Sequence, residues 1–161
     1  MTFDTRERSR YQGQPVECYR FTQGESLWLY TSADAAIVLP SGTYEPEVIR
    51  SGQLDHSQEE GAGNLEVRLP RGNAIAALFV SYLPPRPVSL TVYRAHRGDE
   101  ASPVTRFIGS VASIRFEDSE AILTCVPVSQ ALTRRIPVPM YQTQCNWPLY
   151  AAGCGVIAGS F

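Results

Sequence analysis

Between residues 15 and 126 the chain consists of short runs in which apolar side chains alternate with polar ones. The run Leu65–Leu69, which reads LEVRL, is the clearest case, and a period of two predicts a half-buried strand. The same alternation, or a short apolar run bounded by turn residues, predicts strands at Val16–Phe21, Leu27–Thr31, Ala36–Leu39, Thr43–Ile49, Val88–Ala95, Thr105–Phe116 and Ala121–Val126.

Individual residues in and between these runs predict an edge or irregular strand, a hairpin tip and the face of one long strand. Pro46 cannot donate a backbone hydrogen bond, so its run is expected at an edge or as an irregular strand. Residues 117–119 are expected to form a hairpin tip between the last two strands. The period of two in the long run 105–116 predicts that one face carries Ile108, Ala112, Ile114 and Phe116.

One helix of some length is predicted, over about residues 73–83. Asn73 is a suitable N-cap, apolar residues follow at helical spacing, and Pro84-Pro85 cannot continue a helix. A short helical turn is also expected at Ser129–Arg135. Eight or nine strands with one intervening helix predict a mainly β fold, an antiparallel β-barrel or sandwich that carries the helix.

The remaining stretches divide the chain into parts. Residues 1–14 are charged with little to bury, so they are expected to form an arm that is ordered only if a neighbour receives it. Residues 51–64 and 97–103 are predicted polar loops. Residues 15–136 form the β domain, and Pro137-Val138-Pro139 is an extended linker into a cysteine-containing segment, 137–161.

Composition narrows the function classes. A chain of 161 residues without an apolar run of roughly 20 residues or an N-terminal signal is expected to fold in the cytoplasm of the cell that makes it. The net charge of −2 argues against affinity for nucleic acid through a general positive field. All 14 basic residues are Arg, which suits desolvated protein interfaces, although a codon bias explains this equally well.

The two histidines do not predict an active site. His56 stands beside Glu59 and Glu60, which raises a metal or general-base hypothesis, but no second histidine lies at ligand spacing. A solvated or partner-facing loop is the preferred interpretation. His96 is also placed in a polar loop, so no nucleophile, base and orienting acid can be grouped. We therefore expect that the protein is not an enzyme.

The four cysteines fall into two pairs. Cys18 and Cys125 lie in apolar runs and are expected to be small core residues, and the lack of a secretory signal argues against a disulfide framework. Cys145 and Cys154 stand eight residues apart among glycines, proline and aromatics. Thiolates bind zinc and iron, so these two are half of a four-ligand metal or iron–sulfur site, but their spacing matches neither zinc knuckles nor common ferredoxin runs.

Five motifs carry a resemblance to a known family. They read Pro15-Val16-Glu17-x-Tyr19-x-Phe21, Leu29-Tyr30-Thr31-Ser32, Val92-Tyr93-Arg94-Ala95-His96, Phe107-x-Gly109-x-Val111 and Tyr141-Gln142-x-x-Cys145-x-x-x-Leu149-Tyr150-x-x-x-Cys154-Gly155-Val156. In this order, from about Pro15 to the last residues, the chain resembles the tail-tip hub proteins of long-tailed bacteriophages and gene transfer agents, relatives of minor tail protein L of phage lambda.

The resemblance implies a structural role in a virion tail that is assembled in the host bacterial cytoplasm. Residues 15–136 would be a β-barrel hub domain that lines the channel through which DNA leaves, without binding it specifically. Such proteins form homotrimeric rings that mimic a hexamer. The ring joins the distal tail protein or tail tube to the central tip or fibre protein, and no membrane is involved.

The resemblance also implies a cofactor. Family members carry a C-terminal domain in which four cysteines hold an iron–sulfur cluster, and the first two stand in the same frame as Cys145 and Cys154. These two residues would be two of four ligands of a [4Fe-4S] cluster, whereas Cys18 and Cys125 match no ligand position. Either the frame continues beyond Phe161 with two further cysteines, or a neighbour supplies them, or the cluster domain is lost. We expect the first, and a stop codon directly after Phe161 would rule it out.

Two other functions fit parts of the sequence. A small iron–sulfur or zinc redox or binding protein would need a complete ligand set and reversible electron transfer with a soluble partner. An autonomous ligand-binding β-barrel would be a monomer at micromolar concentration, and assembly into rings with tube proteins would exclude it.

Overall fold

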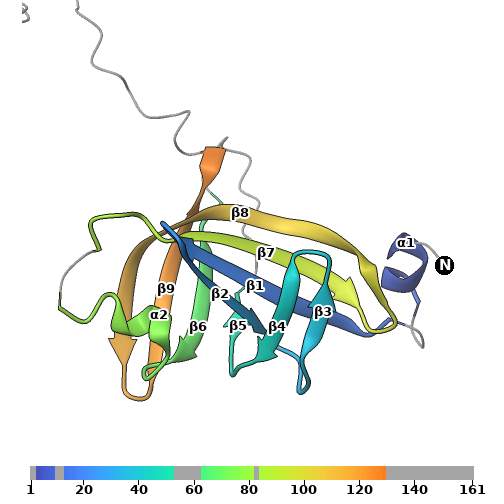
Figure 1. Ribbon diagram of the computed structural model, residues 1–161, viewed down its shortest axis with the longest axis horizontal. Coiled ribbons are helices and arrows are strands. Elements are labelled where there is room, and N and C mark those ends of the chain that lie inside the picture. Colours follow the sequence, from blue (N-terminus) through green and yellow to red (C-terminus); the bar gives the residue numbers. More distant parts are fainter. Residues whose placement is uncertain (1–2, 10–12, 53–62, 82–83, 130–161) are drawn as a thin grey trace, which may run out of the picture.

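The computed structural model describes residues 3–9, 13–52, 63–81 and 84–129 (Figure 1). Its elements in chain order are α1 (Phe3–Glu7), β1 (Pro15–Gln23), β2 (Ser26–Thr31), β3 (Ile37–Leu39), β4 (Gly42–Pro46), β5 (Arg50–Ser51), β6 (Leu65–Pro70), α2 (Ala74–Ala77), β7 (Ser89–His96), β8 (Asp99–Glu117) and β9 (Glu120–Pro127). The mainly β fold predicted from the alternating runs is confirmed.

The nine strands formed by the described residues belong to one sheet, in the order β3-β4-β2-β1-β7-β8-β9-β6-β5. Neighbouring strands are antiparallel, except that β2 and β4 run parallel. The edge strands β3 and β5 have only three and two residues. Short edges leave few unpaired backbone groups to which another chain could add a strand. Contacts to other molecules are therefore expected mainly through side chains.

The sheet is strongly curved, and both faces of its central strand β1 are buried. Alternate residues of a strand point to opposite faces, yet Cys18 and Tyr19 are both fully buried. Tyr19 belongs to the larger core with α2, β6 and β9, whereas Cys18 belongs to a smaller core with β3 and β4. Figure 1 shows β8 arching over the shorter strands, and β3 also contacts β8. This curvature covers both faces of β1 with parts of the same sheet.

The predicted face of the long strand β8 is wrong in its first half. Phe107 and Val111 are in the core, while Ile108 is 55% exposed and Ala112 is also exposed. The pairing of β8 with β9 shifts between Val111 and Ser113, so Ala112 is an extra residue in a β-bulge. Beyond it the half-buried side chains are Ile114 and Phe116, as predicted. A strict period of two fails across a bulge, because the extra residue inverts the alternation.

The predicted helix begins where the sequence indicates but is shorter. Asn73 caps α2, since its side-chain oxygen accepts a hydrogen bond from the backbone N–H of Ile75. The helix ends at Ala77, not near residue 83. A second short helix, α1, forms in the N-terminal arm, where the sequence predicted no helix. The two helices lie at opposite ends of the sheet (Figure 1).

Two predictions for the arm and a loop also differ from the structure. The arm was expected to be ordered only by a neighbour, but α1 lies against β7 of its own chain. The expected polar loop 97–103 is a tight hairpin, in which Gly98 has a φ of +79° and Asp99 already begins β8.

Of the two alternatives for the run with Pro46, the irregular strand fits and the edge does not. Pro46 ends β4, which lies between β3 and β2. Only Glu45 and Pro46 of β4 pair with β2, and they do so in parallel.

Several predictions fall outside the described residues. These are the central part of the polar loop 51–64, most of the helical turn 129–135, the linker 137–139 and the cysteine-containing segment. The predicted hairpin tip 117–119 is described and is confirmed, with Asp118 at a φ of 42°.

Candidate functional site

The residues singled out as possible metal ligands do not belong to the described part of the chain. Cys145, Cys154, His56, Glu59 and Glu60 all lie outside it. Within residues 3–9, 13–52, 63–81 and 84–129, no three side chains of His, Cys, Asp or Glu are grouped as they would be around a metal ion.

Cys18 and Cys125 are core residues, as predicted. Both are fully buried and free. Burial raises the pKa of the Cys125 thiol to about 12. Burial also raises the pKa of Cys18, whose sulfur lies 3.6 Å from the hydroxyl of Thr31. Each thiol belongs to a hydrophobic core cluster, Cys125 to the larger and Cys18 to the smaller.

His96 is not in a polar loop, contrary to the prediction. It is the last residue of β7, and its side chain is only 1% exposed. The residues that bury it come from α1: Glu7 Oε2 lies 2.9 Å from His96 Nε2, and the ring of Phe3 lies 4.9 Å from the imidazole ring. No nucleophile is among these contacts, and they hold the arm to the sheet.

A polar cluster lies inside the curved sheet, built around the carboxylate of Glu17 on β1. Oxygen Oε2 accepts hydrogen bonds from the hydroxyls of Tyr19 and Ser51, each at 2.6 Å. Oxygen Oε1 accepts from the guanidinium of Arg106, which also donates to Ser51 Oγ at 3.3 Å. Both oxygens of a half-buried carboxylate are thereby satisfied, which is the condition for burying charge at low cost.

A second bulge directs Arg106 into this cluster. The register of β7 and β8 passes from Val92 opposite Phe107 to Tyr93 opposite Thr105, which leaves Arg106 as the extra residue. A bulge re-aims the side chain at the extra position. Nothing in the local sequence marks this bulge, so sequence reasoning missed the cluster.

The cluster joins strands that are distant in the sheet order. Ser51 is on β5 at one edge, whereas Glu17 is on β1 in the middle. No backbone pairing between these two strands is recorded among the described residues. The hydrogen bonds therefore hold the rolled sheet closed. Burial raises the pKa of Tyr19, which keeps its hydroxyl protonated as a donor.

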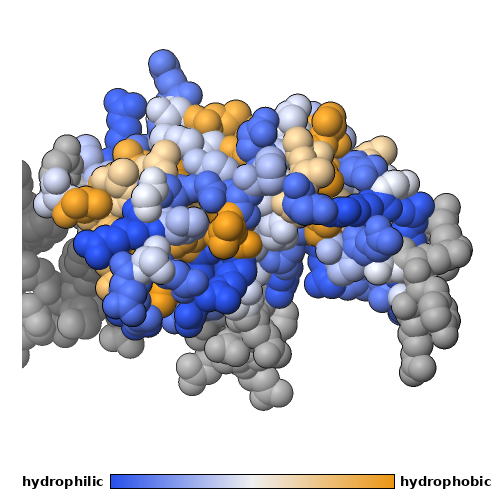
Figure 2. All heavy atoms as spheres, turned by 90° about the horizontal axis from the view of Figure 1, so that it is seen from below, coloured by the Kyte–Doolittle hydropathy of each residue, from blue (hydrophilic) through white to orange (hydrophobic). Residues whose placement is uncertain are grey.

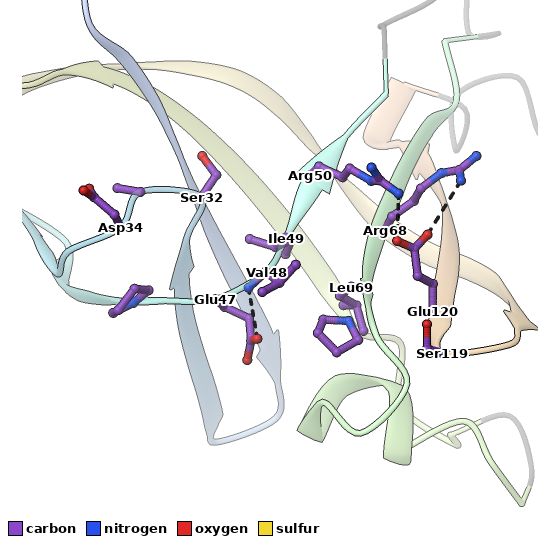
Figure 3. Close-up of a pocket in the computed structure, with 13 residues that line it drawn as sticks. Ser32, Asp34, Glu47, Val48, Ile49, Arg50, Arg68, Leu69, Ser119 and Glu120 are labelled. Atoms are coloured by element: carbon purple, nitrogen blue, oxygen red, sulfur yellow. Dashed lines mark hydrogen bonds and ion pairs between the residues drawn. The ribbon is translucent and has the colours of Figure 1, made fainter.

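An open groove of about 800 Å³ lies on the described surface. It lies between the turn after β2, the connection from β4 to β5, strand β6 and the β8–β9 hairpin (Figure 3). Its lining residues are Ser32, Ala33, Asp34, Pro46, Glu47, Val48, Ile49, Arg50, Arg68, Leu69, Pro70, Ser119 and Glu120. Ile49 and Leu69 are buried at its base, while Val48 is 79% exposed.

Charges of both signs flank the groove. Arg50 lies 2.7 Å and Arg68 lies 3.7 Å from the carboxylate oxygens of Glu120 at one side, and Asp34 and Glu47 lie on the other (Figure 3). The guanidinium of Arg97 hydrogen-bonds Asp34 and lowers the pKa of its carboxyl. Exposed ion pairs around an apolar base are typical of the polar rim and inner part of a protein interface.

The rest of the described surface carries single apolar residues rather than one large patch. On the face drawn in Figure 2, hydrophobic residues form separate patches among hydrophilic ones. Exposed examples outside the groove are Leu27, Val38, Val80, Val104, Ile108 and Val128. Neither α1 nor α2, the helices in the part of the chain that is described, is long and apolar enough to cross a membrane. The groove is therefore the candidate contact surface.

Comparison with protein families gives a match over most of the chain. The family described as "Baseplate hub protein, N-terminal attachment domain" matches residues 12–157. The match covers every strand of the sheet and leaves out α1.

Two individual proteins are also similar to this chain. A protein of Xylella fastidiosa (strain 9a5c) described as uncharacterized is 26% identical over 164 residues, which are 95% of this chain and 34% of the relative. A chain in the solved structure of the virion of a native gene transfer agent particle has a similar fold, with a TM-score of 0.64 at 16% identity. That similarity covers 95% of this chain and 53% of the other. This chain thus spans about a third of the length of the Xylella fastidiosa protein and about half of the length of the gene transfer agent chain.

Proposed function

Because the chain belongs to the family of N-terminal attachment domains of baseplate hub proteins, we propose that it forms a hub ring at the tip of a phage-like tail. The ring joins the tail tube or distal tail protein to the central tip protein. The observation that carries this proposal is the family match over residues 12–157. The fold shared with a chain of a gene transfer agent virion supports it.

The described architecture suits a structural, non-catalytic ring component. The two cores on opposite faces of β1 and the Glu17 cluster stabilise the rolled sheet. Its edge strands are short, which disfavours the addition of strands from other chains. The groove offers a neighbour an apolar base with charges of both signs at its rim. We propose this groove as a contact with an adjoining tail protein.

The proposed stoichiometry is a homotrimer whose subunits each present a hub domain to the channel. DNA passes through the lumen without specific binding. With 16 acidic and 14 basic residues, and many of the arginines in ion pairs, the chain has little net attraction for phosphates. Weak attraction favours passage, because each phosphate held by a cation would release counterions and slow the DNA.

A [4Fe-4S] cluster at Cys145 and Cys154 remains a separate proposal. The other two cysteines, Cys18 and Cys125, are buried in separate hydrophobic cores of the β domain. The cluster therefore requires two ligands from beyond these 161 residues or from a neighbouring chain. Anaerobic purification with iron and acid-labile sulfide analysis tests it, and replacement of Cys145 and Cys154 by Ser should abolish bound iron.

The hub proposal is tested in the particle that encodes the protein. Deletion of the gene should yield tail tubes without a distal tip, and complementation with an epitope-tagged full-length protein should restore the tip. Gold-labelled antibody should then mark only the distal end in electron micrographs. Label along the tube or at the capsid, or normal tips after deletion, would contradict the proposal.

The groove is tested in the same complementation assay with two matched variants. Val48→Asp places a carboxylate in the groove, and Val80→Asp places one on another exposed valine, at 79% and 66% exposure. Both proteins should fold, because exposed substitutions usually change stability by about 0.5 kcal/mol or less. Loss of tips with Val48→Asp alone supports the groove contact, and equal activity of the two variants argues against it.

A further inference from the structure

The N-terminal arm, residues 3–9, binds to a site at the end of the β7–β8 hairpin, which we call the seat. The seat consists of Arg94, His96, Arg97 and Gly98. Glu7 Oε1 lies 2.7 Å from Arg94 Nη2, and Glu7 Oε2 lies 2.9 Å from His96 Nε2. Arg6 donates through Nη1 to the carbonyl of Arg97 at 2.9 Å and through Nη2 to the carbonyl of Gly98 at 3.3 Å. Phe3 covers the imidazole ring of His96. Seat and arm are thus complementary in charge and shape.

The arm owes its structure to the seat. Helix α1 has five residues, and an isolated helix of that length does not form in water. Its contacts to the sheet come from a few side chains, of which Arg6 and Glu7 remain 21% and 34% exposed. Such an element opens at low free energy compared with the cores. The arm is therefore the part of the described chain that can leave the sheet while the sheet stays folded.

The seat, in contrast, needs an occupant. His96 is 1% exposed with Phe3 and Glu7 of the arm against it, and removal of the arm would take away these contacts and leave the Arg94 cation without its Glu7 partner. Even with the arm bound in the same chain, both ring nitrogens of His96 and the Nε atoms of Arg94 and Arg6 are buried without a hydrogen-bond partner among the described residues. His96 Nε2 and Glu7 Oε2 are therefore in close contact at 2.9 Å but are not hydrogen-bonded. A seat of this kind selects a short segment that carries an aromatic ring, a guanidinium and a carboxylate.

We propose that the seat is an exchangeable subunit contact, occupied by residues 3–9 of the same chain in the isolated protein and by residues 3–9 of a second copy in the assembly. The same ion pairs and hydrogen bonds form in both cases, so exchange costs no contact. Domain swapping of this kind is a low-cost route to association between identical chains. The family match begins at residue 12, after the arm. The proposal does not depend on where the ring sits in a tail.

A charge-reversal mixture tests the exchange with full-length chains. Glu7→Arg places a cation against Arg94, and Arg94→Glu places an anion against Glu7, so each variant alone should lose the arm from its own seat. When the two are mixed, the arm of each chain matches the seat of the other. Native mass spectrometry should then show a heterodimer of roughly twice 17.8 kDa that neither variant forms alone. The double variant Glu7→Arg/Arg94→Glu should behave as the parent chain does.

Hydrogen exchange separates a failed exchange from a misfolded variant. In each single variant the arm amides should exchange at least tenfold faster than in the parent, while β1 and β7 stay protected. In the mixture the arm protection should return. Heterodimer with restored protection supports the proposal. If both variants keep a folded sheet and the mixture stays monomeric at the highest soluble concentration, the arm binds only its own chain and the proposal is overturned.

Discussion

At the scale of single residues, burial decides how much each charged pair contributes. The side chains of Glu17 and Arg106 are 19% and 25% exposed, and Glu17 also receives two hydroxyl hydrogen bonds. Arg115 and Glu117 form a pair of the same chemistry on β8, but their side chains are 64% and 52% exposed. Water screens the second pair far more than the first.

We expect Arg106→Met to lower the free energy of unfolding by about 1.5–3 kcal/mol, because it leaves the Glu17 carboxylate without its cation. The matched change Arg115→Met should cost less than about 1 kcal/mol. Urea denaturation of both variants measures the difference. Similar losses for the two variants would show that the Glu17 cluster does not hold the sheet closed.

Cys125 should make stability depend on alkaline pH. Its pKa is 9.0 in an ordinary environment and about 12 in the fold, so above pH 9 the unfolded chain loses a proton that the folded chain keeps. The contribution of the protonated Cys125 thiol to the free energy of unfolding is fully present below pH 9. It is lost between pH 9 and 12, at up to about 1.4 kcal/mol per pH unit. Unfolding measured across this range should show a shallower decline for Cys125→Ala. An unchanged slope would contradict the buried, protonated thiol.

At the scale of elements, the sequence located strands and turns better than it located faces and edges. The run at residues 65–69 became β6 with its three apolar side chains buried, because nothing interrupts its period of two. In the long strand β8, the prediction placed Ile108 on the same face as Ile114 and Phe116, which is wrong. Bulges at residues 106 and 112 interrupt the alternation there. Bulges are set by pairing with β7 and β9, which the run itself does not contain.

The short helix α2 is stabilised by its N-cap residue, Asn73. The Asn73 side chain accepts from the Ile75 backbone N–H at 2.9 Å and donates to Glu47 Oε2 at 3.0 Å, which links the helix to the β4–β5 connection. Asn73→Ala should lower the free energy of unfolding by about 1–2 kcal/mol. Asn73→Ser, which keeps a capping oxygen, should lose clearly less in thermal unfolding monitored by circular dichroism. Equal losses would assign the effect to the Glu47 bond and not to the cap.

At the scale of the whole molecule, the candidate contact surfaces arise from segments far apart in sequence. The groove combines the turn after β2, the β4–β5 connection, β6 and the β8–β9 hairpin, and the arm seat combines α1 with the β7–β8 hairpin. Exposed charged and apolar residues such as Val48 carry no local signal of such a role. The family resemblance therefore indicated a tail-tip hub, but it did not indicate which surfaces the hub would use.

The sequence by itself determined the mainly β class, the positions of most strands, the cap at Asn73 and the core placement of Cys18 and Cys125. Each of these follows from local periodicity or from the chemistry of one residue. Tertiary structure decided the closure of the sheet through Glu17, the burial of His96 and the docking of the arm on β7. These depend on pairings between distant strands, whose register and bulges are set by the packing of the whole sheet.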